Sequence, residues 1–225
     1  MNEKLLAAFY EMIPEAKREL FDKIAQERTK HITVVLENIY QEHNASAVLR
    51  TCDCFGIQEL HVVESKNQYK IQRDIARGAG SWVDMYNYNE GDTALVDCIS
   101  NLKNNGYKIV ALTPDANEHS IFDIPVDQPL ALTFGTEGDG ISDQVRATAD
   151  YQISIPMVGF TESFNVSVSA ALTLQAIRHR LEISEIDWKL SKEEQITTKL
   201  KWCQKYMRNG DVVRRELERR LNEIE

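Results

Sequence analysis

Residues 155–171 read Ile-Pro-Met-Val-Gly-Phe-Thr-Glu-Ser-Phe-Asn-Val-Ser-Val-Ser-Ala-Ala. This order of residue types predicts the end of a strand, a loop with a glycine, and then a helix rich in serine and alanine. Ser163 and Asn165 stand where the loop becomes the helix, and side chains of this kind accept hydrogen bonds from the open N–H groups of a helix start. One cap does not require so many polar side chains. The surplus indicates that the turn has a second role.

Outward from this segment, short apolar and β-branched stretches alternate with helical patterns. Strands are expected at Ile32–Glu37, Glu59–Val63, Lys108–Leu112, Leu130–Phe134 and Tyr151–Ile155. Their apolar character on both faces is typical of buried parallel strands. Helices are expected from about Asn44 to Phe55, before Gly56, and over Asp92–Asn104. The alternation predicts a doubly wound α/β domain that covers residues 31–183.

Both ends of the chain have helical spacing instead. Residues 1–30 carry apolar side chains three and four apart, and Pro14 is expected to divide them into two helices. Residues 184–225 are highly charged with sparse apolar anchors, which also predicts helices. The chain is therefore divided into an N-terminal helical extension (1–30), the α/β domain (31–183) and a C-terminal helical extension (184–225).

Composition limits the function. The chain has 225 residues, of which 43% are hydrophobic, so it can bury a substantial core. A net charge of −9 argues against coating nucleic acid by bulk charge. Lysine and arginine balance the acidic residues near the ends, 6 against 6 in residues 1–31 and 10 against 9 in residues 185–225. The ends are therefore where contact with an anion is expected.

The cysteines and the apolar runs indicate the compartment. Cys52, Cys54, Cys98 and Cys203 form neither a Cys-x-x-Cys pair nor a spaced metal set. No apolar run is long enough for a membrane span, and the first residues lack the layout of a signal peptide. We expect a cytoplasmic protein with reduced thiols, no metal and no membrane contact.

Three loops follow predicted strands, at the strand ends where parallel α/β sheets bind ligands. The first carries Asn44 and Arg50, the second is the glycine-rich run Gly135–Gly140, and the third is the opening segment. Taken singly, each has a structural reading: a cap with a surface ion pair, a tight turn, and a helix start. The glycine loop is not a phosphate-binding P-loop, because no Lys-Ser/Thr follows it. Their shared place after buried strands favours one common site.

The three loops resemble the motifs of the TrmH-like 2′-O-ribose branch of the SPOUT family of RNA methyltransferases. Asn44 to Arg50-Thr51 is similar to its Asn-x-x-x-x-x-Arg-Thr motif, and Phe134 to Gly140 to its Phe-Gly-x-Glu-Gly-x-Gly motif. Ile155 to Ser167 is similar to its third motif, with Phe164 in place of the usual leucine. Short helical extensions are typical of the branch's tRNA members.

The resemblance implies a C-terminal trefoil knot, S-adenosylmethionine as cofactor, a homodimer, and methyl transfer to a ribose 2′-hydroxyl of RNA, foremost a D-loop guanosine (position 18) of tRNA. The implied catalytic residues are Asn44, Arg50, Glu137, Ser163 and Asn165. The implied cofactor-binding residues are Leu112, Thr113, Gly135, Glu137, Gly138, Ile155, Met157 and Phe164. The candidate RNA contacts are Arg18, Arg28, Lys30, Lys201, Lys205, Arg208, Arg214 and Arg215.

Other functions stay open at this point. A ribosomal RNA substrate is the alternative within the same class. The near-neutral ends also fit an RNA-binding protein of the same fold that has lost catalysis. A nucleotide-binding protein that uses the glycine loop for phosphate is the third alternative, although the loop lacks the lysine of a P-loop.

Overall fold

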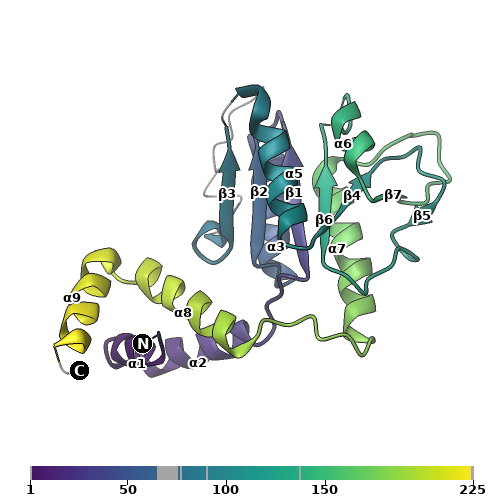
Figure 1. Ribbon diagram of the computed structural model, residues 1–225. Helices are drawn as coiled ribbons and strands as arrows, with labels where there is room; N and C mark the ends of the chain where they lie inside the picture. Colours follow the sequence, from purple (N-terminus) through teal and green to yellow (C-terminus); the bar gives the residue numbers. More distant parts are fainter. Residues whose placement is uncertain (1, 65–75, 77, 90, 137, 224–225) are drawn as a thin grey trace. The chain divides into compact units, whose positions relative to one another are not determined.

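The computed structural model describes residues 2–64, 76, 78–89, 91–136 and 138–223. It contains two compact units, one formed by Lys30–Trp188 and the other by Met1–Thr29 together with Lys189–Glu225 (Figure 1). The predicted residue Glu137 lies outside the described residues.

The larger unit is built on a seven-stranded sheet with the order β3-β2-β1-β6-β4-β7-β5. All neighbouring strands run parallel. The strands are β1 (Ile32–Glu37), β2 (Glu59–Val63), β3 (Asp84–Tyr88), β4 (Lys108–Leu112), β5 (His119–Ser120), β6 (Leu130–Phe134) and β7 (Tyr151–Ser154). Because the strands are parallel, all their carboxyl ends lie at one edge of the sheet.

Helices cover both faces of this sheet. They are α3 (Glu42–Cys54), α5 (Ala94–Asn104), α6 (Asp143–Thr148) and α7 (Val166–Glu182), with short 3-10 helices at η1 (Ala79–Ser81) and η2 (Gly91–Thr93). Val34 and Leu36 of β1 belong to the core shared with α3 and α7, whereas Val35 belongs to the core shared with α5 and α6. Successive side chains of the strand therefore pack into cores on opposite faces of the sheet, which confirms the predicted doubly wound α/β fold.

The predicted bounds of β1, β2, β4 and β6 agree with the structure residue for residue. Four other bounds were wrong: β7 ends at Ser154, α5 begins at Ala94 after η2, and α3 both begins earlier, at Glu42, and ends earlier, at Cys54. Asn44 is thus the third residue of its helix and not its cap. The sequence did not predict β3 or β5, because β3 is a partly exposed, polar edge strand and β5 has two residues.

The smaller unit is helical and joins the two ends of the chain. It contains α1 (Asn2–Glu11), α2 (Glu15–Ala25), α8 (Lys192–Tyr206) and α9 (Gly210–Asn222). As predicted, Pro14 separates α1 from α2. The rings of Phe21 and Trp202 lie 5.5 Å apart, and α1 packs against both α8 and α9. None of the helices in the described part of the chain is long and apolar enough to cross a bilayer.

Candidate functional site

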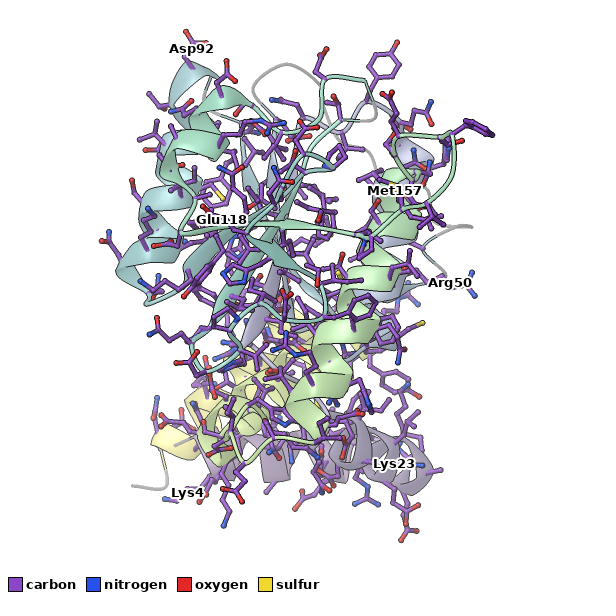
Figure 2. The ribbon with its side chains drawn as sticks, turned by 90° about the vertical axis from the view of Figure 1, so that its right-hand side faces the viewer. Lys4, Lys23, Arg50, Asp92, Glu118 and Met157 are labelled. Atoms are coloured by element: carbon purple, nitrogen blue, oxygen red, sulfur yellow. The ribbon has the colours of Figure 1, made fainter. Side chains whose placement is uncertain are left out.

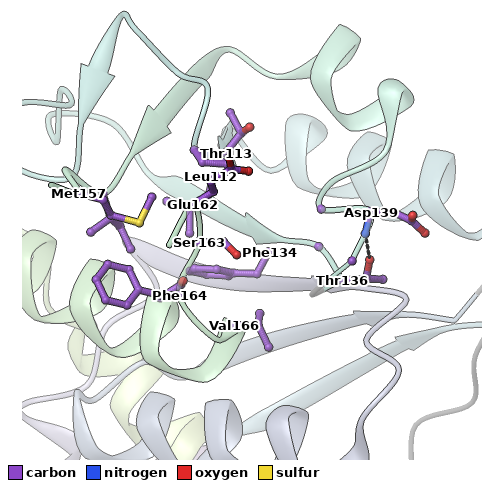
Figure 3. Close-up of a pocket in the computed structure, with 16 residues that line it drawn as sticks. Leu112, Thr113, Phe134, Thr136, Asp139, Met157, Glu162, Ser163, Phe164 and Val166 are labelled. Atoms are coloured by element: carbon purple, nitrogen blue, oxygen red, sulfur yellow. Dashed lines mark hydrogen bonds between the residues drawn. The ribbon is translucent and has the colours of Figure 1, made fainter. Parts of the chain in front are cut away.

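The sheet order brings the three motif loops together. β1, β6, β4 and β7 are consecutive neighbours in the sheet, although three of them lie far from β1 in sequence. The loops after β1, β6 and β7 therefore leave the same edge side by side. A pocket opens there, lined by the loops after β4, β6 and β7 and the start of α7, and no described residue of the first motif lines it (Figure 3).

All predicted cofactor-binding residues that the structure describes line this pocket. They are Leu112, Thr113, Gly135, Gly138, Ile155, Met157 and Phe164. Of the predicted catalytic residues, Ser163 also lines it. The prediction for Glu137 falls outside the described residues.

The glycine loop forms one wall because its backbone folds back on itself. The N–H of Thr136 donates to the carbonyl oxygen of Gly140 at 3.0 Å, and the N–H of Gly140 donates to the carbonyl oxygen of Thr136 at 3.1 Å. The Thr136 hydroxyl also accepts from the N–H of Asp139 at 3.0 Å. A Cβ on Gly135 would lie 2.0 Å from the Gly140 oxygen. Only glycine fits there, which explains its place at the end of β6.

Thr113 supplies a polar group that the protein leaves unused. Its N–H donates to the carbonyl oxygen of Ile153 at 3.0 Å, so that N–H is engaged within the sheet. Its hydroxyl is buried and finds no hydrogen-bond partner among the described residues. A buried hydroxyl without a partner costs free energy. A polar ligand atom in the pocket would remove that cost.

The pocket carries negative charge. Among the described lining residues, the charged side chains are those of Asp139 and Glu162. Figure 3 shows Met157 and Asp139 at opposite ends of the pocket, with Glu162 between them. Carboxylates attract a cation and repel a phosphate. The pocket therefore suits a ligand with positive charge, and it disfavours a nucleoside polyphosphate.

Asn165 caps α7 and also connects two motifs. Its side-chain oxygen accepts from the N–H of Ser167 at 2.9 Å, which confirms the predicted cap. Its Nδ2 donates to Oδ1 of Asn44 at 3.2 Å, and Asn44 in turn donates to Oε1 of Gln41 at 3.1 Å. Ser163, the other expected cap, lines the pocket instead. Asn44, which is 2% exposed, thus ties the start of α3 to the start of α7.

Arg50 does not reach the pocket of its own chain. It lies on α3 with an exposed side chain, which points outward in Figure 2. It is absent from the residues that line the pocket. Within one chain, Arg50 and the pocket are therefore separate features.

The candidate RNA contacts differ in their surroundings. Lys205, Arg208 and Arg215 are exposed, whereas Arg18 and Lys201 are half-buried. Two others form ion pairs within the chain, Lys30 with Glu59 at 3.1 Å and Arg214 with Glu218 at 2.7 Å. The expectation for Arg28 was wrong: it is 2% exposed and lies over the ring of Trp202. It packs inside the helical unit, so it cannot meet a phosphate.

Sequence reasoning missed the buried Glu37 and the two pocket carboxylates. Glu37 closes β1 and accepts from the N–H of Ser142 at 2.9 Å. A charged residue at the end of an otherwise apolar strand was the available signal. Within the described residues, no group of three or more potential metal ligands comes together, and the expectation of no metal stays a prediction.

A parallel α/β domain with a backbone-walled pocket at its carboxyl edge defines a class of ligand-binding domains. Within that class, residues 31–175 match the SpoU rRNA Methylase family. The chain belongs to this family.

Three relatives illustrate the likeness. A Borreliella burgdorferi protein named tRNA (guanosine(18)-2'-O)-methyltransferase is 33% identical over 93% of this chain and 94% of its own length. The crystal structure of an A. aeolicus TrmH/SpoU tRNA modifying enzyme has a TM-score of 0.76 at 28% identity, and it covers 86% of this chain and 98% of that one. AviRb from Streptomyces viridochromogenes, solved in complex with AdoMet, is similar in fold alone, with a TM-score of 0.59 at 20% identity over 72% of this chain and 62% of its own.

Proposed function

We propose that the chain transfers a methyl group from S-adenosylmethionine to the ribose 2′-hydroxyl of guanosine 18 in the D-loop of tRNA. The observation that carries this proposal is the extent of the Borreliella likeness, which covers 93% of the chain. It therefore reaches beyond residues 31–175, which match the family as a whole, and includes most of the terminal helices. Those helices are where a substrate preference within the family would reside.

The pocket fits the proposed cofactor. S-adenosylmethionine carries a sulfonium and an ammonium group, which suit the carboxylates of Glu162 and Asp139. The unpartnered hydroxyl of Thr113 offers a hydrogen bond to a polar atom of the cofactor. Gly135 leaves the backbone bare on the pocket wall. The same charges argue against the nucleotide-binding alternative.

The chemistry needs a methyl acceptor that loses a proton. Bound S-adenosylmethionine supplies an electrophilic methyl group on its sulfonium. A ribose hydroxyl is a weak nucleophile at neutral pH, and the charge that develops on its oxygen must be stabilised. An arginine side chain stays protonated at neutral pH, so it is a poor base, but its N–H groups are strong hydrogen-bond donors in a fixed arrangement. We assign Arg50 to orient the substrate phosphate and stabilise that oxygen while the hydroxyl proton passes to solvent water, and we assign Asn44, Ser163 and Asn165 to organise the pocket.

We further propose that two copies of the chain complete each site. Exposed apolar side chains lie on the loop before α7 and along one side of α7 itself. They are Val158 (105% exposed), Phe160 (109%), Phe164 (43%), Val168 (43%) and Leu172 (39%). Large apolar side chains exposed on neighbouring segments of the chain mark an interaction site. A second copy would cover it and would bring its Arg50 to the pocket.

Subunit mixing tests the shared site. Arg50→Ala removes the arginine, and Gly135→Val disrupts the glycine loop that walls the pocket, because a Cβ there lies 2.0 Å from the backbone oxygen of Gly140. Each variant alone is expected to be inactive. Random mixing of the two is expected to restore about a quarter of the wild-type activity, since half of the dimers are mixed and each holds one intact site. A mixture as inactive as its components, with dimers confirmed by light scattering, contradicts the shared site.

The resemblance also leads us to propose the trefoil knot. After β7 the chain enters α7, which packs against α3, the helix that follows β1, although β6 and β4 separate β7 from β1 in the sheet. A connection of this kind supports a threaded path, which is rare in folds generally. Tracing residues 112–165 in an experimental electron-density map tests it, and an unthreaded path would contradict it.

The proposal includes a location in the cell. We place the protein in the cytoplasm, where thiols stay reduced and tRNA is modified. Three of the four cysteines are buried, and the structure contains no disulfide among its described residues. Burial raises the pKa of the thiols of Cys98 and Cys203 to about 12, so they are inert.

The decisive test in the cell is mass spectrometry of tRNA and rRNA from a deletion strain. Loss of 2′-O-methylguanosine from tRNA, restored by the wild-type gene, is expected. Ribose methylation that disappears from rRNA alone would establish the ribosomal alternative. An unchanged pattern in both RNAs would favour the catalytically silent one.

A further inference from the structure

Glu37 occupies an unusual place for a charged side chain. It ends β1, whose other residues are Ile, Thr, Val, Val and Leu, and it is 4% exposed. A buried carboxylate is costly unless hydrogen bonds satisfy it. Its Oε2 accepts from the main-chain N–H of Ser142 at 2.9 Å, across 105 residues of sequence.

This bond anchors the far end of the glycine loop. Ser142 stands just after the loop and caps α6 by accepting from the N–H of Val145 at 3.2 Å. The near end of the loop continues β6, where Gly135 leaves the sheet. Between the two ends, the loop is closed on itself by the paired bonds of Thr136 and Gly140. The loop is thus held at three points, and Glu37 provides the one that comes from another strand.

The anchor also has a defined position relative to the first motif. The residue after Glu37 is Asn38, whose φ of 52° lies in the left-handed region. The chain therefore turns away immediately after the carboxylate and runs into α3, which carries Asn44. Asparagine adopts this conformation more readily than most residues do, so the turn is ordinary and the buried carboxylate beside it is the unusual feature.

We infer that Glu37 is a positioning residue, which holds the glycine loop in the conformation that binds the cofactor. It does not touch the pocket itself, since it is absent from the lining residues. It acts through Ser142 and the loop. The inference rests on the proposed use of S-adenosylmethionine.

Cofactor binding measured by calorimetry tests the inference without any turnover. Glu37→Leu removes the acceptor and is expected to weaken S-adenosylmethionine binding by roughly tenfold, or about 1.4 kcal/mol. Glu37→Gln keeps an acceptor oxygen at the same position and is expected to bind within about twofold of the wild type. Recovery by this conservative variant distinguishes the hydrogen bond from simple occupation of space.

Asp150, which is exposed and also pairs with Lys103 and Lys108, offers a control at the other edge of the sheet. Its Oδ2 accepts from the main-chain N–H of Ile109 at 2.9 Å, so it makes the same kind of bond. That bond lies at the amino ends of β4 and β7, at the edge opposite the pocket. Asp150→Leu is expected to lower thermal stability and leave cofactor affinity unchanged. If both leucine variants weaken binding equally, Glu37 has a structural role only.

Ser142→Pro breaks the same bond from the donor side, so it tests the inference alone if Glu37→Leu folds poorly and completes a double-mutant cycle if Glu37→Leu folds. Ser142 has a φ of −67°, which proline adopts, so Ser142→Pro removes the donor N–H. Ser142→Ala is its reference, because both variants remove the capping hydroxyl. Relative to Ser142→Ala, Ser142→Pro is expected to weaken S-adenosylmethionine binding roughly tenfold. The decreases in affinity from Glu37→Leu and Ser142→Pro are expected to be non-additive. Additive decreases overturn the inference, whereas a wild type that binds no S-adenosylmethionine overturns the proposed function itself.

Discussion

Gly135→Ala is the substitution whose effect follows most directly from the structure. The added Cβ would lie 2.0 Å from the oxygen and 2.2 Å from the carbon of Gly140, and 2.4 Å from the nitrogen of Ile141. All three atoms are backbone, so no side chain can move aside. Ordinary contact begins at 3.4 Å, and the loop must therefore open by more than an ångström.

Opening the loop breaks the two bonds between Thr136 and Gly140. At about 1 kcal/mol for each bond, the cost is about 2 kcal/mol. Cofactor affinity should then fall roughly 30-fold, because binding requires the closed loop. Titration calorimetry with S-adenosylmethionine measures this, and circular dichroism confirms the fold.

Gly159→Ala is the control. Gly159 lies in the loop before α7, and a Cβ there meets its nearest atom at 4.0 Å. This variant should bind like the wild type. The steric argument is refuted if Gly135→Ala also binds S-adenosylmethionine with wild-type affinity.

Three further predictions concern other parts of the chain. Arg50→Ala should abolish methyl transfer while calorimetry still detects cofactor binding, and equal loss of both would show a structural role. Burial lowers the pKa of His61 to about 4, so as the pH falls the unfolded chain takes up this proton before the folded chain does. The free energy of unfolding is therefore at its full value above pH 6.5 and falls by up to roughly 3 kcal/mol as the pH drops toward 4. Urea unfolding at pH 7.5 and 5 should show this decrease in the wild type and a smaller one in His61→Phe; equal decreases in both would refute it. Substituting alanine for Lys205, Arg208 or Arg215 should lower the slope of log affinity for tRNA against log salt by about 1 for each phosphate that the side chain neutralises, and an affinity that does not depend on salt would exclude all three as phosphate-binding residues.

The sequence predicted the centre of the sheet well and its edges poorly. β1, β2 and β6 are buried along their whole length, so composition alone marks them. In β3, Tyr86 and Asn87 are exposed, and the strand is defined by its pairing with β2. Pairing of this kind leaves no local signal.

The pocket was predictable because topology determines it. Parallel strands place the loops that follow them at one edge of the sheet, and the motif loops are recognisable in the sequence by their glycine and small polar residues. The bonds that hold the loops were not predictable. Glu37 meets Ser142 across 105 residues, and Asn165 meets Asn44 across 121. The burial of Arg28 likewise depends on Trp202, from the other end of the chain.

Methylation of guanosine 18 can be assayed with purified protein, S-adenosylmethionine and an unmodified tRNA transcript. Nuclease digestion followed by mass spectrometry maps any methyl group to a nucleotide. We predict 2′-O-methylguanosine at position 18 with the wild type and none with Arg50→Ala. A transcript that stays unmethylated, or a methyl group on a base or on another ribose, would contradict the account.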